Sequence, residues 1–156
     1  MEIATVRAFQ QALAAQIAEL NMETGLDKGA GGTQIGDTLR IVLPVNEGHD
    51  AVLTEVVVSS FNEESDYLMF YSTMILEIGP GYEALKEMLL DWNLLCPLGS
   101  FGIYRQGRQF YHKLSLPFPR DVDPKTLADK AMYLLELLYD VISERFPEAV
   151  QLSGHG

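Results

Sequence analysis

The chain has 156 residues, 47% hydrophobic and 21% charged, a composition typical of one folded domain and unlike that of a disordered chain. Its formal net charge is −11, because residues 1–100 carry 15 acidic against 4 basic side chains whereas residues 101–156 carry 7 of each. A field of this sign repels phosphate backbones and anionic lipid surfaces, so we expect neither a nucleic-acid nor a membrane partner.

An amphipathic helix is predicted at the start of the chain, because apolar residues recur there every three or four positions as far as Asn21. The segment that follows, residues 25–32, contains four glycines. Glycine loses the most backbone freedom on ordering, so this segment is predicted to be a mobile loop. The apolar residues of the helix are Val6, Phe9, Leu13, Ile17 and Leu20.

Three strands are predicted next, over residues 37–45, 52–61 and 67–78, from β-type apolar patterns separated by turn-forming segments. Pro44 lacks a backbone donor, so we expect the first of these strands to end there or to lie at an edge. The third strand is apolar at both alternating sets of positions, which predicts that both of its faces are covered. The two sets are Tyr67, Met69, Tyr71 and Ile75, and Leu68, Phe70, Met74 and Leu76.

A second helix is predicted after residues 79–81, and its outer side is unusual. Leu90 and Leu94 lie four residues apart and about half a turn from the main apolar stripe, on the otherwise acidic side of the helix. A helix that is apolar on two sides must bury both. Either a neighbouring loop covers the two leucines, or they form an oligomer contact. The main stripe is Tyr82, Leu85, Met88, Leu89, Trp92 and Leu95.

A hairpin is predicted from residues 101–104 and 110–116, with a two-residue turn in which Gly107 supplies a positive φ. Arg105 and Arg108 would face each other across this turn, where like charges repel. With Lys113 and Arg120 they either meet an acidic partner or second subunit, or extend into water. One face of the hairpin carries Phe101, Ile103, Phe110, His112, Leu114 and Leu116, and the other carries Tyr104, Gln109, Tyr111, Lys113 and Ser115.

A last helix is predicted to begin at Asp123 and Pro124, which supply a capping carboxylate and a proline in the first turn. Its wide apolar stripe is expected to end at Pro147, and residues 151–156 are expected to fray. The whole chain, residues 1–156, is therefore expected to be a single domain.

The sequence has few candidates for catalytic, metal-binding or phosphate-binding residues, and none of them forms a recognised motif. The three histidines have no metal-ligand spacing, and His112 is expected either to be partly buried with one hydrogen bond or to contact a pocket or interface. Cys96 follows a helix end, where the dipole disfavours a thiolate. The glycines of residues 29–32 follow a helix and precede a strand, the reverse of a phosphate loop. We therefore expect no catalytic residue, metal or cofactor.

The location is expected to be cytoplasmic. Cys96 has no second cysteine with which to form an internal disulfide, and the chain does not begin with a secretory signal pattern. No apolar run approaches the length of a membrane helix.

Several short segments in the second half of the chain carry a resemblance to a known fold. They are Trp92-Asn93-Leu94-Leu95, Phe101-Gly102-Ile103-Tyr104, Gly107, Phe110-Tyr111-His112-Lys113, Leu114-Ser115-Leu116-Pro117 and the helix from Asp123. Together with the predicted order of elements, αβββαββα, they resemble the type III secretion chaperone-like fold, and more closely its YbjN-like branch. The chain is also similar to an uncharacterised cyanobacterial family that shares this fold. The resemblance implies an α+β fold in which helices cover a twisted, five-stranded antiparallel sheet. It also implies a noncatalytic homodimer that binds protein segments.

The sequence thus predicts a protein-binding module, chaperone-like or a regulatory adaptor and not an enzyme, that acts as a homodimer and recognises polypeptide segments through apolar patches. The alternative is a small-molecule sensor or small enzyme with a pocket between sheet and helices, near His112, Tyr104 and Tyr111. The residues expected at a dimer or partner interface are Leu90, Leu94, Tyr104, Arg105, Arg108 and Tyr111.

Overall fold

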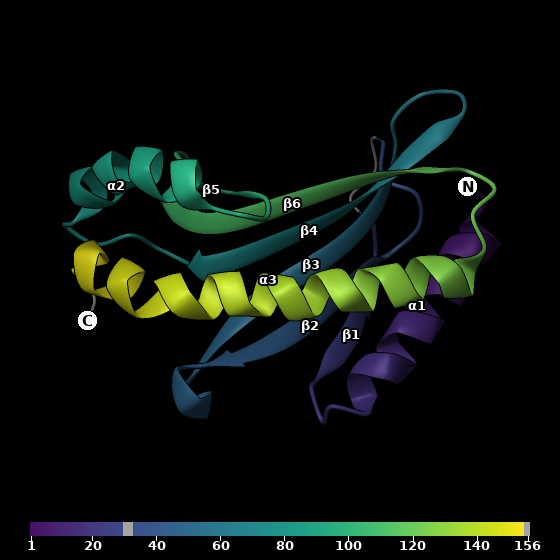
Figure 1. The fold of residues 1–156 in the computed structure, drawn as a ribbon, viewed down its shortest axis with the longest axis horizontal. Helices are drawn as coiled ribbons and strands as arrows, with labels where there is room; N and C mark the ends of the chain where they lie inside the picture. Colours follow the sequence, from purple (N-terminus) through teal and green to yellow (C-terminus); the bar gives the residue numbers. More distant parts are fainter. Residues whose placement is uncertain (30–32, 155–156) are drawn as a thin grey trace.

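The computed structural model describes residues 1–29 and 33–154, and within them three helices lie on one face of an antiparallel sheet of six strands (Figure 1). The sheet order is β1-β2-β3-β4-β6-β5. The helices are α1 (Ile3–Ala18), α2 (Tyr82–Leu95) and α3 (Pro124–Ser153). The strands are β1 (Thr24–Asp27), β2 (Thr38–Val45), β3 (Asp50–Ser60), β4 (Ser65–Ile75), β5 (Ser100–Tyr104) and β6 (Gln109–Pro119), with a 3-10 turn, η1 (Asn46–Gly48), between β2 and β3.

The prediction of five strands is wrong, because β1 (Thr24–Asp27) overlaps the start of the segment, residues 25–32, expected to be a loop. All four of its residues are exposed, so no alternating apolar pattern marks it. It is held by pairing with β2, from Thr24 opposite Ile41 to Asp27 opposite Thr38, and by an ion pair between Asp27 and Arg40. The order of elements is therefore αββββαββα. Residues 30–32 of the expected loop lie outside the described residues.

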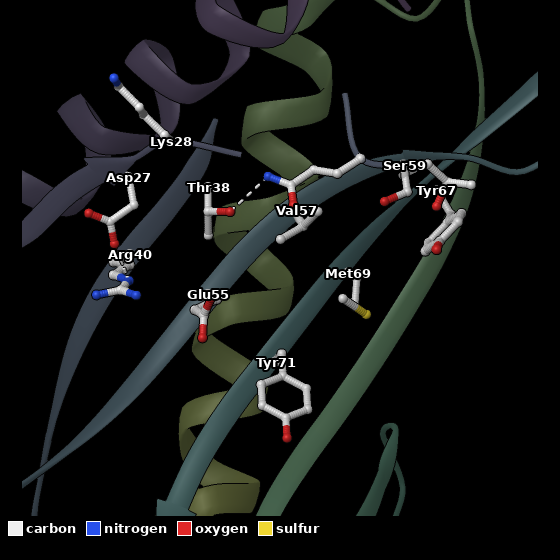
Figure 2. A pocket seen from close by; sticks show the side chains of 12 residues that line it. Asp27, Lys28, Thr38, Arg40, Glu55, Val57, Ser59, Tyr67, Met69 and Tyr71 are labelled. Atoms are coloured by element: carbon white, nitrogen blue, oxygen red, sulfur yellow. Dashed lines mark hydrogen bonds and ion pairs between the residues drawn. The ribbon is translucent and has the colours of Figure 1, made fainter. Parts of the chain in front are cut away.

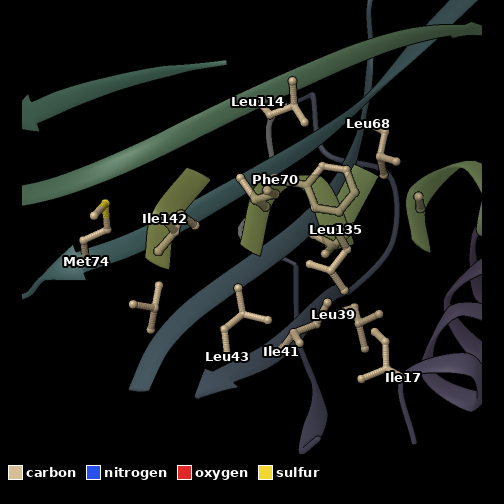
Figure 3. Packing of buried hydrophobic residues seen from close by; sticks show 14 of the residues in the cluster. Ile17, Leu39, Ile41, Leu43, Leu68, Phe70, Met74, Leu114, Leu135 and Ile142 are labelled. Carbon is tan, nitrogen blue, oxygen red and sulfur yellow. The ribbon is translucent and has the colours of Figure 1, made fainter. Parts of the chain in front are cut away.

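One hydrophobic core fills the space between the sheet and the helices. Figure 3 shows Leu135 of α3 beside Phe70 of β4, and Ile142 further along α3 in the direction of Met74. The predicted stripe of α1 is confirmed except at its end, since Leu20 is 52% exposed. Fully or nearly fully buried side chains come from every helix and from β2, β3, β4 and β6, including Phe9, Leu13, Ile41, Val56, Leu68, Leu85, Phe110 and Leu138.

The expectation that both faces of the third strand are covered is also wrong. In β4, Leu68, Phe70 and Met74 are buried under the helices, whereas Tyr67, Met69 and Tyr71 are only partly buried. These three residues lie on the face of the sheet opposite the helices, which we call the open face. Ile75, the fourth member of their predicted set, is instead buried in the core, because the register shifts between Thr73 and Ile75. Long aromatic and thioether side chains there shield one another without a covering layer, so their apolar character did not require one.

Pro44 is the next-to-last residue of β2, close to the predicted end of the strand, and the register explains why it is tolerated. The Val42 N–H donates to the Glu23 carbonyl on the β1 side of the strand. The backbone nitrogen of Pro44, two residues later, faces the same side at a point that β1 does not reach. The missing N–H of Pro44 therefore leaves no carbonyl of a neighbouring strand without its hydrogen bond.

The last helix runs through Pro147 to Ser153, so the predicted stop at Pro147 is wrong, and so is fraying of residues 151–153. The Asp123 carboxylate caps it as expected, accepting a hydrogen bond from the Thr126 N–H. Its C-terminal end is anchored because the Gly81 N–H donates to the Ser153 carbonyl and the Gly79 N–H donates to the Ser153 hydroxyl. Residues 155–156 lie outside the described residues.

The hairpin turn differs from the two-residue turn that the sequence predicts. Tyr104 and Gln109 form the last pair, so four residues connect the strands. Arg108, with a φ of 51°, and not Gly107 takes the left-handed conformation. Arg105 and Arg108 therefore do not oppose each other in the ladder, although the Arg108 N–H donates to the Arg105 carbonyl. The predicted division of the hairpin into two faces is confirmed, with Phe101, Phe110 and His112 buried.

Candidate functional site

The outer surface of α2, which we define by Leu90, Leu94 and Leu95, is strongly exposed. The exposed fractions of these side chains are 81%, 82% and 71%. No loop of the described chain therefore covers Leu90 and Leu94. Of the two alternatives for the apolar outer side of this helix, packing under a neighbouring loop is excluded for these residues. Leu95 was expected in the buried stripe, but the buried positions of α2 are Leu85 and Trp92 and the helix ends at Leu95.

The base under this surface is rigid. The Trp92 ring packs edge-on against Phe101 and Phe110, with ring centroids 5.7 and 5.8 Å away. The Asn93 side chain also binds β5 twice, since its amide donates to the Phe101 carbonyl and its oxygen accepts from the Phe101 N–H. α2 is therefore fixed on the sheet while Leu90 and Leu94 face away from it.

The same Asn93 contact limits strand addition at this edge of the sheet. β5 is an edge strand of five residues, and Phe101 directs its backbone groups away from β6. Asn93 occupies both of these groups, which an incoming strand would otherwise use. Recognition at this end of the molecule is thus better served by the side chains of α2 than by the edge of the sheet.

Arg108, although exposed, binds the segment that leads into α2. Its guanidinium donates to the carbonyls of Ile78 and Gly79 at 3.0–3.2 Å and lies 4.7 Å from the centroid of the Tyr82 ring. Arg105 is exposed and remains available at the tip of the hairpin. Of the two arginines that the sequence singles out, one has a role in holding the fold together.

His112 is completely buried on the covered face of the hairpin. Its Nε2 lies 2.7 Å from the Leu98 carbonyl oxygen, so Nε2 carries the proton. Its Nδ1 has no hydrogen-bond partner among the described residues. Cys96 donates to the same Leu98 carbonyl. Tyr104 and Tyr111 lie on the opposite face of the sheet, so the pocket envisaged around these three residues does not form.

Burial lowers the pKa of His112, although the hydrogen bond to Leu98 opposes this shift. Because the unfolded chain then binds a proton more readily than the folded chain, the free energy of unfolding should be unaffected by His112 above pH about 6.5 and fall as the pH drops below it. Urea titrations across this range measure the effect. His112→Phe should remove it and His49→Gln, at an exposed turn, should not. An unchanged pH profile in His112→Phe would contradict this prediction.

An apolar hollow of about 370 Å³ lies on the helical side of the molecule, between the end of α1, β2 and α3. It is lined by Leu20, Met22, Leu43, Pro44, Met132, Leu135, Glu136, Tyr139 and Asp140. Most of these side chains are apolar, and two carboxylates stand at its rim. A hollow of this composition is suited to the apolar side chain of a partner.

The open face carries a second and more polar hollow, which the sequence did not predict. It has a volume of about 450 Å³ and extends over β1 to β4 and the segment before β2 (Figure 2). Figure 2 shows Arg40, Glu55 and Tyr71 side by side on adjacent strands. The remaining lining is Asp27, Lys28, Thr33, Gln34, Thr38, Val57, Ser59, Tyr67 and Met69. The alternation of Tyr67, Met69 and Tyr71 is visible in the sequence, but there it predicts a covered face and not a hollow.

Comparison with known proteins gives no family for this chain: no family model matches it, and no curated protein is significantly similar to it. Within residues 1–29 and 33–154, no group of three His, Cys, Asp or Glu side chains is placed to hold a metal ion. Among the helices of this part of the chain, none has both the length and the apolar character needed to cross a membrane.

Proposed function

We propose that the protein is a noncatalytic, cytoplasmic protein-binding module, chaperone-like or an adaptor, that works as a homodimer formed through the outer surface of α2. The exposure of Leu90 and Leu94, at 81% and 82%, is the observation that carries the proposal. Two large apolar side chains one helical turn apart on a rigidly held helix lose contact with water when a second copy covers them.

The charges around the leucines favour an antiparallel pairing of two α2 helices. Glu83 and Glu87 lie toward the N-terminal half of α2, and Leu90 and Leu94 lie toward its C-terminal half. When two such helices cross antiparallel at their leucines, the glutamates of one copy extend beyond the leucines of the other. The apolar residues then meet while Glu83 and Glu87 of the two copies stay apart, and only Asp91, exposed between Leu90 and Leu94, lies close to the contact.

The apolar hollow between α1, β2 and α3 is the surface we propose for partner polypeptides. It lies on the helical side of the molecule and shares no lining residue with the outer surface of α2, so a dimer would leave it accessible. Its lining of leucine, methionine and tyrosine fits apolar side chains of an extended segment, and Glu136 and Asp140 at its rim favour a segment that also carries basic residues.

The fold that we propose is a variant of the type III secretion chaperone-like fold with an added edge strand. From β2 onward, three strands, a helix, two strands and a helix follow in the expected sequence. β1 extends the sheet at the end away from α2. The order of elements supports the proposed fold only. The proposed function is supported by the outer surface of α2 and by the apolar hollow.

The test is the mass of the protein in solution. Sedimentation equilibrium should give twice the chain mass of 17.4 kDa for the native sequence and the single chain mass for Leu90→Glu/Leu94→Glu. Leu26→Glu, at a leucine that is 55% exposed on β1, is the matched control and should stay dimeric. Circular dichroism verifies that each variant is folded. A monomeric native protein, or a dimeric double variant, would refute the proposed interface.

A further inference from the structure

The hollow on the open face is independent of α2, and its lining is balanced in charge. Among the described lining residues, Asp27 and Glu55 are acidic and Lys28 and Arg40 are basic. This balance contrasts with the net charge of −11 for the whole chain. A ligand with a net charge of either sign gains no overall attraction from such a lining, which favours a neutral polar ligand.

Three side chains form a row across the floor of the hollow. Arg40 lies opposite Glu55, and Glu55 lies opposite Tyr71, so that the row crosses three adjacent strands and is about 10 Å long. Arg40 forms its ion pair with Asp27 and not with Glu55. The Glu55 carboxylate therefore stands in the hollow between a planar cation and an aromatic ring, with oxygens that are able to accept hydrogen bonds from a ligand.

The ring of Tyr71 is held in place from behind. Tyr111 stacks on it with ring centroids 4.8 Å apart and an interplanar angle of 28°, while Tyr71 itself lines the hollow. Tyr111 has room for this because residue 102 is glycine: a Cβ there would lie 2.5 Å from the Tyr111 ring. Tyr111 is thus a positioning residue, and Tyr71 offers the hollow a fixed aromatic surface.

The hydroxyl of Tyr71 is kept as a hydrogen-bond donor. Burial, with smaller contributions from Tyr111, Glu55 and Tyr104, raises the pKa of Tyr71 above its ordinary value of 10.0. Tyr67, Ser59 and Thr38 add further hydroxyl groups to the lining. The hollow thus combines an aromatic surface with planar charged groups and several hydroxyls, all in an open depression.

We propose that the open-face hollow binds a neutral saccharide, with the C–H face of a sugar ring on Tyr71 and its hydroxyls on Glu55 and Arg40. A pyranose presents weakly positive C–H groups on its faces, which the negative face of an aromatic ring attracts. Two neighbouring sugar hydroxyls donate to the two oxygens of one carboxylate, or accept from two N–H groups of one guanidinium. A volume of about 450 Å³ accommodates one or two sugar rings.

Methionine methyl groups provide a direct readout in the native protein. The chain has six methionines, of which Met69 lines the open-face hollow while Met22 and Met132 line the apolar hollow. The protein labelled with ¹³C at these methyls would be titrated with methyl glucoside, methyl galactoside, methyl mannoside, maltose and cellobiose. At least one of these sugars should shift the Met69 resonance saturably and leave those of Met22 and Met132 in place.

Two variants test the roles of the side chains. Glu55→Gln removes a charged acceptor and Tyr71→Leu removes the aromatic surface, and each should weaken binding of the responding sugar about tenfold or more. Lys113→Gln is the matched control, because Lys113 lies opposite Tyr71 on the open face but outside the hollow. It should leave the affinity unchanged.

Three outcomes would overturn the proposal. The first is a Met69 resonance that no sugar moves at high millimolar concentration. The second is a sugar response at Met22 and Met132 instead of Met69. The third is a Met69 response to adenosine or to glycine betaine with none to any sugar, which would assign the hollow to a nucleoside or a zwitterion. None of these results depends on whether the protein is a dimer.

Discussion

Phe110→Ala is expected to destabilise the protein by about 3–5 kcal/mol, because it removes a fully buried ring from the point where α2 meets the sheet. Phe110 lies 5.8 Å from both Trp92 and Phe101, measured between ring centroids. Its loss leaves a cavity that these two rings are not able to fill without moving α2. Since Trp92 is the only tryptophan, its fluorescence during urea unfolding measures the change.

The control for this prediction is Phe61→Ala. Phe61 is 66% exposed at the end of β3 and makes one edge contact, with Tyr67 at 6.4 Å. Its removal should change the free energy of unfolding by no more than about 0.5 kcal/mol. Both variants should be compared at one protein concentration, since formation of the proposed dimer would make the free energy of unfolding depend on it. Equal effects of the two substitutions would show that the aromatic cluster does not fix α2.

Gly81→Ala is expected to destabilise the protein by about 2–3 kcal/mol through a collision between two backbone segments. A Cβ on Gly81 would lie 1.6 Å from the Leu152 carbonyl oxygen at the end of α3. The φ and ψ of Gly81, −81° and 18°, suit alanine, so the cost arises from this contact alone. Either the start of α2 or the end of α3 must move, and the hydrogen bond from the Gly81 N–H to Ser153 is lost.

Urea unfolding and amide hydrogen exchange together test this prediction. Exchange at the end of α3 should accelerate in Gly81→Ala, because the anchor at Ser153 is broken. Gly25→Ala is the matched control, since a Cβ on Gly25 meets no atom within 4 Å. A Gly81→Ala protein as stable as the control variant would mean that the two helix ends are free to separate.

The elements that the sequence predicted well are those in which burial follows a regular period. Val6, Phe9, Leu13 and Ile17 recur at helical spacing and are buried, and Phe101, Phe110 and His112 share the covered face of the hairpin as expected. In these segments the local pattern and the tertiary packing agree, so the pattern alone is sufficient.

The elements that the sequence missed depend on contacts between distant parts of the chain. β1 has no buried side chain, and it forms because its backbone pairs with that of β2. α3 continues past Pro147 because Gly79 and Gly81, far away in sequence, bind Ser153. The open-face hollow was missed for a related reason: Tyr67, Met69 and Tyr71 are apolar enough to suggest a covering layer, and only the placement of all three helices on one side shows that none is present there.

The pair of hydrogen bonds between Asn93 and Phe101 has a consequence for how this protein behaves when it is abundant. A carboxamide carries N–H donors and a carbonyl acceptor, as a peptide group does, and so Asn93 pairs with Phe101 of the edge strand in place of another chain. Fibre growth from that end would first have to displace it. The exposed leucines of the outer surface of α2 thus lie beside a sheet edge at which one residue is already hydrogen-bonded within the same chain.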